Sequence, residues 1–247
     1  MKLTVVGCGD AFGSGGRLQT SFHVQANGHN FLIDCGATVM IGLNRLKIDP
    51  NTIDTIFISH LHGDHFSGLV WWLLHGQHIA KRVTPLTVVG PATIQQRFKT
   101  AAEALFPGST VVKPRFEMRF VEFAKETPLD IGNLRMTAFE VSHPSGSMSA
   151  ALRFEVGGKC LAFSGDTEWV ESLVSAGRDA DLLIMECFAY EGPTRYHLDW
   201  KTISANLPRI GAKRLMLTHM NEGMLARRDE AAAAGAILSD DGFAIEF

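Results

Sequence analysis

Short apolar runs alternate along the chain with turns rich in glycine, proline and asparagine, as is typical of sheets with intervening helices. Strands are predicted over 1–6, 22–26, 30–34, 52–59, 86–89, 116–123, 134–141, 150–156, 160–163, 182–185, 214–217 and 243–247. Helices are predicted over 65–75, 93–106, 202–207 and 226–234, with the third ending near Pro208. A succession of strands, helix and strands occurs twice. This pattern predicts an α/β protein whose two similar halves pack as a single domain over residues 1–247.

Several of these apolar runs end at an ionisable residue. The residues concerned are His60, His143, Asp166, Glu186 and His219. In sheets flanked by helices, sites form at strand ends, because loops there carry polar groups that the strands hold in place. The pattern therefore favours a site built from these strand ends.

The composition is that of a globular protein, with 46% apolar and 20% charged residues in a chain of 247. A chain of this length buries a core large enough to fold without a metal or a disulfide, so any metal site needs a functional explanation. The net charge of −3 does not favour a partner held by bulk positive charge, such as nucleic acid.

The cysteines and the first residues bear on the compartment. Cys8, Cys35, Cys160 and Cys187 are widely spaced without a C-x-x-C motif, which predicts free thiols in a reducing compartment. Residues 1–12 lack the features of a signal peptide. The longest apolar stretch, 68–74, is far shorter than the roughly 20 residues that span a bilayer. We therefore expect a soluble, cytoplasmic protein with no membrane partner.

The strongest chemical signal is the segment His60-Leu61-His62-Gly63-Asp64-His65. In an extended loop leaving a strand, alternate residues point the same way, so His60 and His62 can bind one ion. Gly63 permits a sharp turn, which directs Asp64 and His65 toward a second point. Imidazole and carboxylate together suit zinc, iron or manganese. A metal-binding segment is favoured over a solvated loop, because clustered imidazoles without a metal repel one another once protonated.

This H-x-H-x-D-H segment resembles the metal-binding motif of the metallo-β-lactamase fold superfamily of di-metal hydrolases. The resemblance covers nearly the whole chain and includes 31–36, His143 after a strand, Asp166 in Ser-Gly-Asp-Thr, and His219 in Leu-Thr-His. Within the superfamily the chain is most similar to the ribonuclease Z branch and its phosphodiesterase and arylsulfatase-like relatives. The segments 186–188 and 196–198 carry that similarity, although Asp199 stands where the branch usually has Thr.

The resemblance implies an αββα sandwich, in which two packed mixed β-sheets are flanked by helices. It also implies two metal ions, with zinc expected and Mn²⁺ or Fe²⁺ as alternatives. Such a pair can share a water and stabilise the attacking and leaving oxygens of an ester. The implied ligands are His60, His62 and His143 for one ion, Asp64, His65 and His219 for the other, and Asp166 for both.

The leaving alkoxide of an ester needs a proton or charge stabilisation. His197 is a candidate for this role, and Glu186 is a candidate to hold its ring in one tautomer. With Asp64, these are the predicted catalytic residues. The alternatives are a His197 that caps the helix near Thr202 and a Glu186 that is purely structural.

Nearby aromatic residues are interpreted mainly as core, and Arg17 in the glycine-rich turn mainly as a solvated surface residue. The aromatic residues are Phe66, Trp71, Trp72, Phe188, Tyr190, Tyr196 and Trp200.

The segment from His143 to Asp166 bears on the substrate. Ribonuclease Z proteins that process transfer RNA commonly carry a long arm, which the bacterial form inserts between the corresponding motifs. Here only 23 positions separate the two residues, and a predicted hairpin over 150–163 occupies most of them. We therefore expect a small-molecule phosphodiester substrate, and we do not expect nucleic acid. A homodimer is compatible with the sequence, which does not determine the oligomeric state.

Three other functions stay open. One is hydrolysis of another ester class, such as an arylsulfate, a lactone or a thioester. Another is tRNA 3′-processing by an endonuclease. The third is a metal-binding regulatory protein without turnover.

Overall fold

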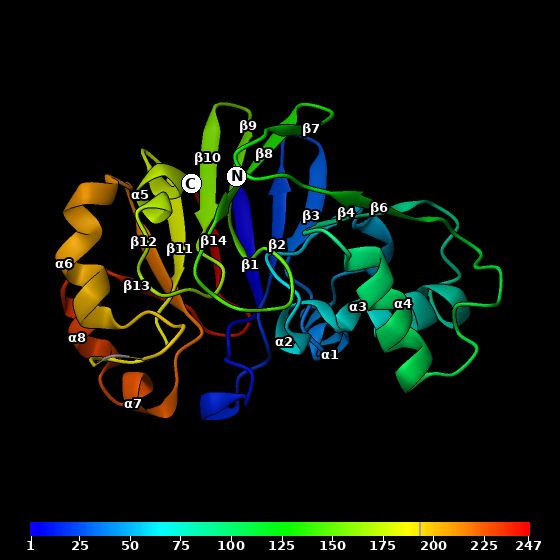
Figure 1. The fold of residues 1–247 in the computed structure, drawn as a ribbon, viewed down its shortest axis with the longest axis horizontal. Helices are drawn as coiled ribbons and strands as arrows, with labels where there is room; N and C mark the ends of the chain where they lie inside the picture. The colour runs from blue at the N-terminus through cyan, green and yellow to red at the C-terminus, as the bar shows by residue number, and fades with distance from the viewer. Residues whose placement is uncertain (193) are drawn as a thin grey trace.

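The computed structural model describes residues 1–192 and 194–247. Across these residues, two seven-stranded β-sheets pack against each other, and helices cover their outer faces (Figure 1). The strand orders are β14-β1-β2-β3-β4-β5-β6 in the first sheet and β13-β12-β11-β10-β9-β8-β7 in the second. The predicted αββα sandwich is confirmed.

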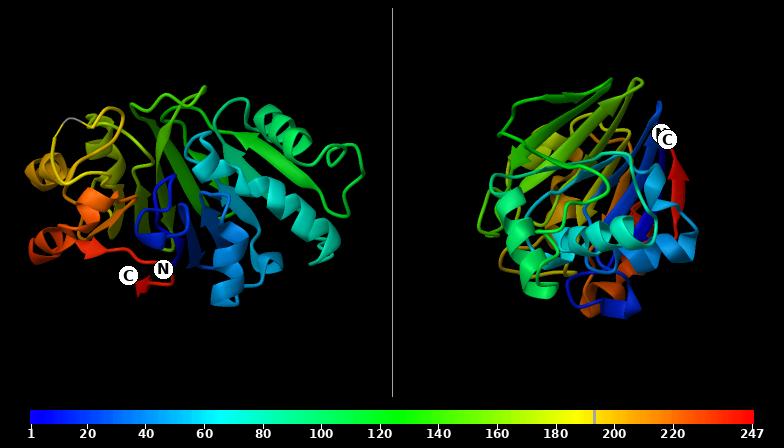
Figure 2. Two further views of the ribbon diagram at one scale, coloured as in Figure 1. Left: turned by 90° about the horizontal axis from the view of Figure 1, so that it is seen from below. Right: turned by 90° about the vertical axis from the view of Figure 1, so that its right-hand side faces the viewer.

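The first sheet combines an antiparallel start with parallel strands from β3 to β6. Its strands are β1 (Lys2–Gly7), β2 (Ser21–Ala26), β3 (His29–Ile33), β4 (Thr55–Phe57), β5 (Leu86–Gly90), β6 (Met118–Glu122) and β14 (Ala244–Glu246). The helices of this half are η1 (Ser14–Gly16), α1 (Val39–Leu46), η2 (Pro50–Thr52), α2 (Gly63–Phe66), α3 (Gly68–His78) and α4 (Ile94–Leu105). Because β14 pairs with β1, the two chain ends lie side by side (Figure 2).

The second sheet begins with two hairpins and continues with parallel strands. Its strands are β7 (Leu129–Ile131), β8 (Leu134–Glu140), β9 (Ala150–Val156), β10 (Lys159–Phe163), β11 (Leu182–Glu186), β12 (Leu215–Thr218) and β13 (Ile237–Leu238). The helices of this half are α5 (Ser172–Gly177), α6 (Trp200–Ile210), α7 (Glu222–Leu225) and α8 (Arg228–Ala233). Within the described part of the chain, no helix has the length and apolar character needed to cross a bilayer.

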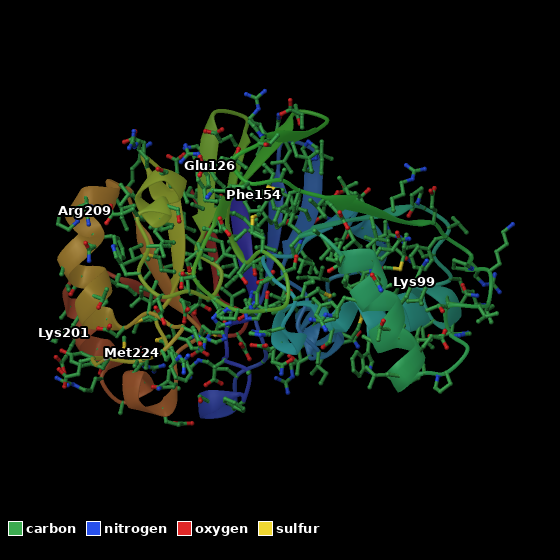
Figure 3. All side chains as sticks on the ribbon, in the orientation of Figure 1. Lys99, Glu126, Phe154, Lys201, Arg209 and Met224 are labelled. Carbon is green, nitrogen blue, oxygen red and sulfur yellow. The ribbon has the colours of Figure 1, made fainter. Side chains whose placement is uncertain are left out.

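Phenylalanine rings fill the space between the sheets. Phe154 from β9 packs on Phe31 and Phe57 from the first sheet, with ring centroids 5.3 and 4.9 Å away. All three are fully buried, and each buried ring contributes about 1.5–3 kcal/mol to stability. Figure 3 shows Phe154 near the middle of the molecule, whereas Lys99 and Lys201 lie on the outer helices. This core therefore fixes the two sheets against each other and thereby fixes the positions of the strand ends.

The helices depart from the sequence predictions in several places. Pro208 lies inside α6 and does not end the helix, because buried Ile210 anchors the last turn and Gly211 terminates it in the left-handed conformation. The helix predicted over 226–234 is the short helix α8, and a separate short helix that was not predicted, α7, precedes it. The single helix predicted over 65–75 is divided into α2 and α3. The short helices α1 and α5 were not predicted, because the alternation of apolar runs and turns used to find the elements gave no signal for them.

Parallel strands bring the ionisable strand ends together. β10, β11 and β12 are parallel neighbours, so their carboxyl ends meet at one edge of the sheet. Glu186 ends β11, and Asp166 and His219 follow β10 and β12. Helices α2 and α7, which begin close to His62 and His219, lie at the same end of the molecule (Figure 1). The fold thus gathers residues from both halves at one end of the sandwich.

Candidate metal centre

One donor set consists of three histidines from both halves of the fold. His60 follows β4, His62 immediately precedes α2, and His143 follows β8. Their ligand nitrogens all lie within 4.8 Å of one another. Nε2 of His143 lies 2.9 Å from Nδ1 of His62, so two nitrogen atoms face each other at contact distance. A cation shared by the three rings would satisfy these nitrogens together.

A second donor set lies beside the first and combines Asp64, His65, Asp166 and His219. Nε2 of His65 is 3.2 Å from the Asp64 Oδ2 and 3.3 Å from the Asp166 Oδ2. Nε2 of His219 is 3.4 and 3.3 Å from the same two oxygens. A tetrahedral ion with ligands at about 2.0–2.1 Å has its ligands about 3.3–3.4 Å apart. The spacing of these donors therefore matches the edges of a tetrahedral zinc-type site.

Asp166 connects the two sets. Its Oδ2 lies 3.9 Å from the His143 Nε2 and 4.0 Å from the His60 Nε2, in addition to its contacts with the second set. Asp166 is buried, and desolvation alone would raise its pKa. The surrounding histidines nonetheless lower the pKa well below its ordinary value, so this carboxylate is charged and can face two cations.

Gly63 acts differently from the sequence prediction. It is the first residue of α2, in a right-handed helical turn, and it does not adopt a positive φ. The turn of helix itself places Asp64 and His65 away from His62. The predicted change of direction occurs, but helix initiation produces it rather than the conformational freedom of glycine.

Asp34 and Ser59 fix the rings of His60 and His65. Asp34 accepts hydrogen bonds from the Ser59 N–H at 2.7 Å, the Ser59 hydroxyl at 2.8 Å and the His65 Nδ1 at 2.6 Å. Because the Ser59 hydroxyl donates to Asp34, it accepts from the His60 Nδ1 at 3.0 Å. Nδ1 of both histidines thus carries a proton, so Nε2 is the atom of each ring that faces the centre and would bind a metal.

Buried polar atoms without partners test whether the residues fit a metal. Within 1–192 and 194–247, the Nε2 atoms of His60 and His65, the Oδ1 of Asp166 and the Nδ1 of His219 are buried without a hydrogen-bond partner. Leaving such atoms unpaired costs about 1–3 kcal/mol each. Divalent metal ions would coordinate the two Nε2 lone pairs and the Asp166 carboxylate. The donor set therefore fits a metal centre.

Electrostatics set the protonation of the histidines. Burial lowers the pKa of His143 to about 4, so its ring is neutral at pH 7, and its Nδ1 donates to the Tyr196 carbonyl at 2.8 Å. Burial alone would lower the pKa of His65, but the carboxylates of Asp166 and Asp64 are among those that raise it well above its ordinary value. The centre is therefore strongly attractive to cations.

His197 and Glu186 lie next to the donor sets. Nδ1 of His197 is 3.0 Å from the Glu186 Oε2, and Phe188 stacks on the imidazole with centroids 4.7 Å apart. Burial lowers the pKa of His197. Burial and the nearby Asp166 raise the pKa of Glu186 well above its ordinary value. The structure thus brings the predicted pair together, with the ring of His197 held on two sides.

The sequence over residues 1–240 matches the family described as anti-Pycsar protein Apyc1. The chain belongs to this family. The probable metallo-hydrolase YhfI of Bacillus subtilis is 26% identical over 227 residues, which cover 89% of this chain and 87% of that protein. Ribonuclease Z of Methanosarcina acetivorans is 25% identical over 269 residues, covering 90% of this chain and 88% of that protein.

Solved structures share the fold. The metallo-β-lactamase fold protein YhfI from Bacillus subtilis matches with a TM-score of 0.81 at 24% identity, covering 99% of both chains. The short form of human tRNase Z matches with a TM-score of 0.79 at 22% identity, covering 100% of this chain and 99% of that one. The resemblance to the metallo-β-lactamase superfamily and its ribonuclease Z branch is confirmed. Together with the donor cluster, these relatives identify the chain as a metal-dependent hydrolase.

A pocket of about 240 Å³ opens onto the donor atoms of this Apyc1 family member. Four of its lining residues, Ala11, Phe12, Phe188 and Tyr196, are not candidate ligands or catalytic residues. Of the aromatic residues interpreted as core, Phe66, Trp72, Tyr190 and Trp200 are buried. Phe188 and Tyr196 line the pocket.

Two further residues at the site, Asp34 and Phe12, were not predicted from the sequence. Asp34 lies in the segment 31–36 that carried part of the family resemblance, so that segment was the available signal. Phe12 had no signal, because a lone aromatic residue in a glycine-rich turn carries no pattern. Arg17 also differs from its interpretation as a solvated residue, since its side chain is only 7% exposed and pairs with Asp240 at 3.5 Å.

Proposed function

We propose that the protein hydrolyses a small phosphodiester with two zinc ions bound in the donor cluster. The observation that carries the proposal is the position of the Asp166 Oδ2, within 4.0 Å of donors from both sets. Two bound zinc ions would supply Lewis-acid stabilisation of the ester oxygens and an activated water. Mn²⁺ and Fe²⁺ are alternatives with the same ligand preference.

The proposed ligands divide as the two donor sets do. His60, His62 and His143 would hold one ion, Asp64, His65 and His219 the other, and Asp166 both. Five of these seven side chains are buried, which keeps competing water away from the donors. Asp34 and Ser59 would preserve the ligand geometry, because their hydrogen bonds fix two of the rings.

His197 would assist the leaving group. Its Nδ1 is engaged by Glu186, so Nε2 is the atom through which the ring would deliver a proton. The stacked Phe188 and the Glu186 carboxyl fix the ring plane, which places that atom reproducibly in the pocket. The pair would thus position a proton donor beside the proposed ions.

The segment between His143 and Asp166 supports a small substrate. β9 and β10 form a tight hairpin across Gly157 and Gly158, with no insertion in this described segment. The pocket over the donors is about 240 Å³, which suits a small ester. Buried free cysteines also support a reducing compartment such as the cytoplasm.

The test compares kcat/KM for a small phosphodiester and for a precursor transfer RNA, each at low and moderate salt. We expect the small diester to be hydrolysed at least as well, with little dependence on salt, because few phosphates would be neutralised. A preference for the RNA by several orders of magnitude, lost as salt rises, would contradict the proposal and favour the nuclease function. A parallel screen of arylsulfates, lactones and thioesters would reveal a different ester class.

A further inference from the structure

Among the residues that the structure describes, Phe12 is the most exposed large apolar residue, with 89% of its surface accessible. Phenylalanine is usually buried, so a ring left in solvent needs an explanation. Phe12 lines the pocket that also contains His62, Asp64 and His219. An apolar ring is therefore presented to solvent at the rim of a polar donor cluster.

The turn that carries Phe12 is fixed rather than loose. Buried Asp10 accepts hydrogen bonds from the Phe12 N–H at 3.1 Å, the Ser14 N–H at 2.9 Å and the Ser14 hydroxyl at 2.7 Å. The Gln19 side-chain amide donates to the Ala11 carbonyl at 3.1 Å, and the Gly15 N–H donates to Glu222 on α7 at 2.7 Å. The backbone thus holds Phe12 in place before any ligand arrives, which lowers the ordering cost of a contact.

The pocket combines two kinds of surface. The donor atoms present charge and lone pairs, whereas Phe12, Ala11 and Phe188 present apolar surface to the same space. One face of Phe188 is already covered by His197, at a centroid distance of 4.7 Å. No described residue forms an aromatic pair with the Phe12 ring, which leaves it available to a ligand.

We propose that Phe12 is a specificity residue that contacts a planar aromatic or heteroaromatic substituent of the substrate. The proposal rests on the proposed function in one respect, which is that the ester group occupies the donor cluster. Aromatic pairs gain energy beyond the area they bury, so a flat ring is favoured over an alkyl group of modest size. The contact would select among esters without taking part in the chemical step.

A binding experiment tests the contact without turnover. Phenylphosphonate and methylphosphonate carry the same anionic group, and their affinities for the zinc-loaded protein can be compared by calorimetry. We expect the parent to prefer phenylphosphonate and Phe12→Ala to reduce that preference about ten-fold. Phe12→Tyr should retain it. Val111→Ala, at a residue 83% exposed that does not line the pocket, is the matched control and should leave the preference unchanged.

A second arm uses 4-nitrophenyl phenyl phosphate and 4-nitrophenyl methyl phosphate, which share one leaving group. Phe12→Ala should lower kcat/KM about ten-fold for the phenyl ester and leave the methyl ester unchanged. Two results would overturn the Phe12 assignment. One is that Phe12→Ala leaves the preference for phenylphosphonate unchanged. The other is that Phe12→Ala changes the molecular mass of the protein in solution and not this preference. If the parent hydrolyses neither ester while its phosphonate preference depends on Phe12, the assignment stands and the proposed function fails.

Discussion

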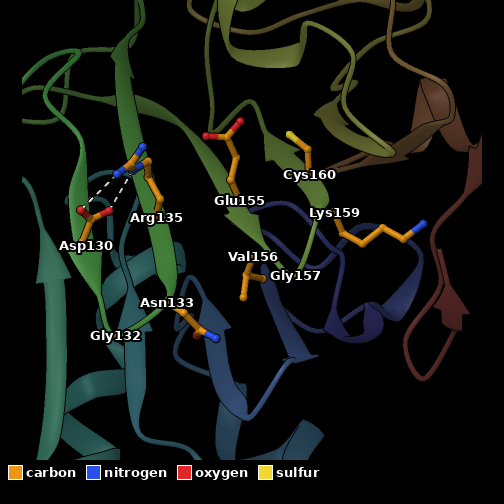
Figure 4. A pocket seen from close by; sticks show the side chains of 10 residues that line it. Asp130, Gly132, Asn133, Arg135, Glu155, Val156, Gly157, Lys159 and Cys160 are labelled. Atoms are coloured by element: carbon orange, nitrogen blue, oxygen red, sulfur yellow. Dashed lines mark hydrogen bonds and ion pairs between the residues drawn. The ribbon is translucent and has the colours of Figure 1, made fainter.

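Two hollows at different places on the molecule differ in size and in chemistry. The groove between the β7–β8 and β9–β10 turns has a volume of about 510 Å³, against about 240 Å³ for the pocket over the donor cluster. In the larger groove, Arg135 pairs with Asp130 at 2.9 Å (Figure 4). Both side chains are more than half exposed. Glu155 pairs with Arg153 at 2.9 Å.

The smaller pocket has the opposite properties. Its floor contains buried nitrogen and oxygen atoms that lack hydrogen-bond partners among the described residues. Forming or losing an exposed ion pair changes the free energy of the protein little. A buried polar atom without a partner destabilises the protein unless a ligand binds it. Buried polar atoms without hydrogen-bond partners therefore indicate the functional site better than the volume of a hollow does.

The largest expected effect is at His62. His62→Ala removes a proposed ligand whose Nδ1 lies 2.9 Å from the His143 Nε2, so the bound metal should fall and hydrolysis should be abolished. The fold should persist, because the core between the sheets is large. Elemental analysis, an assay and circular dichroism check these points. Asn133→Ala in the larger groove is the control and should change none of them.

His197→Ala should keep the metal and lower turnover about 10²–10⁴-fold, because the leaving group loses its proton donor. The loss should be smaller for nitrophenolate, which leaves without protonation. Steady-state rates with good and poor leaving groups measure this difference, and His29→Ala provides a histidine control remote from the pocket. Equal losses for both leaving groups would assign His197 a positioning role, and metal loss would make it a ligand.

Ser59→Ala should weaken metal binding about 10–100-fold, since the hydroxyl no longer links Asp34 to the His60 ring. Competition with a chromogenic chelator measures the affinity. Ser109 follows α4, and its hydroxyl donates to the Ala102 carbonyl within that helix, so Ser109→Ala is the matched control. An unchanged metal affinity in Ser59→Ala would show that the hydrogen bond from His60 to the Ser59 hydroxyl does not contribute to metal binding.

Arg135→Ala tests the larger groove directly and should have the smallest effect. The pair with Asp130 is exposed, so neither hydrolysis nor the midpoint of thermal unfolding should change measurably. An assay and a thermal melt decide the outcome. A clear loss of activity would mean that this groove contributes to function and that the contrast between the two hollows is wrong.

The comparison also shows what a sequence can predict. Strand ends and the segment from His60 to His65 could be recognised, because period-two patterning and ligand spacing are local. The predicted site residues meet at one end of the sandwich, since parallel strands direct them there. Phe12 and the length of α6 could not be predicted, because exposure at a pocket rim and the burial of Ile210 depend on the tertiary structure.

The central claim is that the donor cluster binds a pair of metal ions, and the metal content of the parent protein tests it most directly. The protein would be supplemented with zinc, freed of loosely bound ions by gel filtration and examined by elemental analysis. The two donor sets joined by Asp166 predict close to two ions per chain. No more than trace metal after supplementation would contradict the claim.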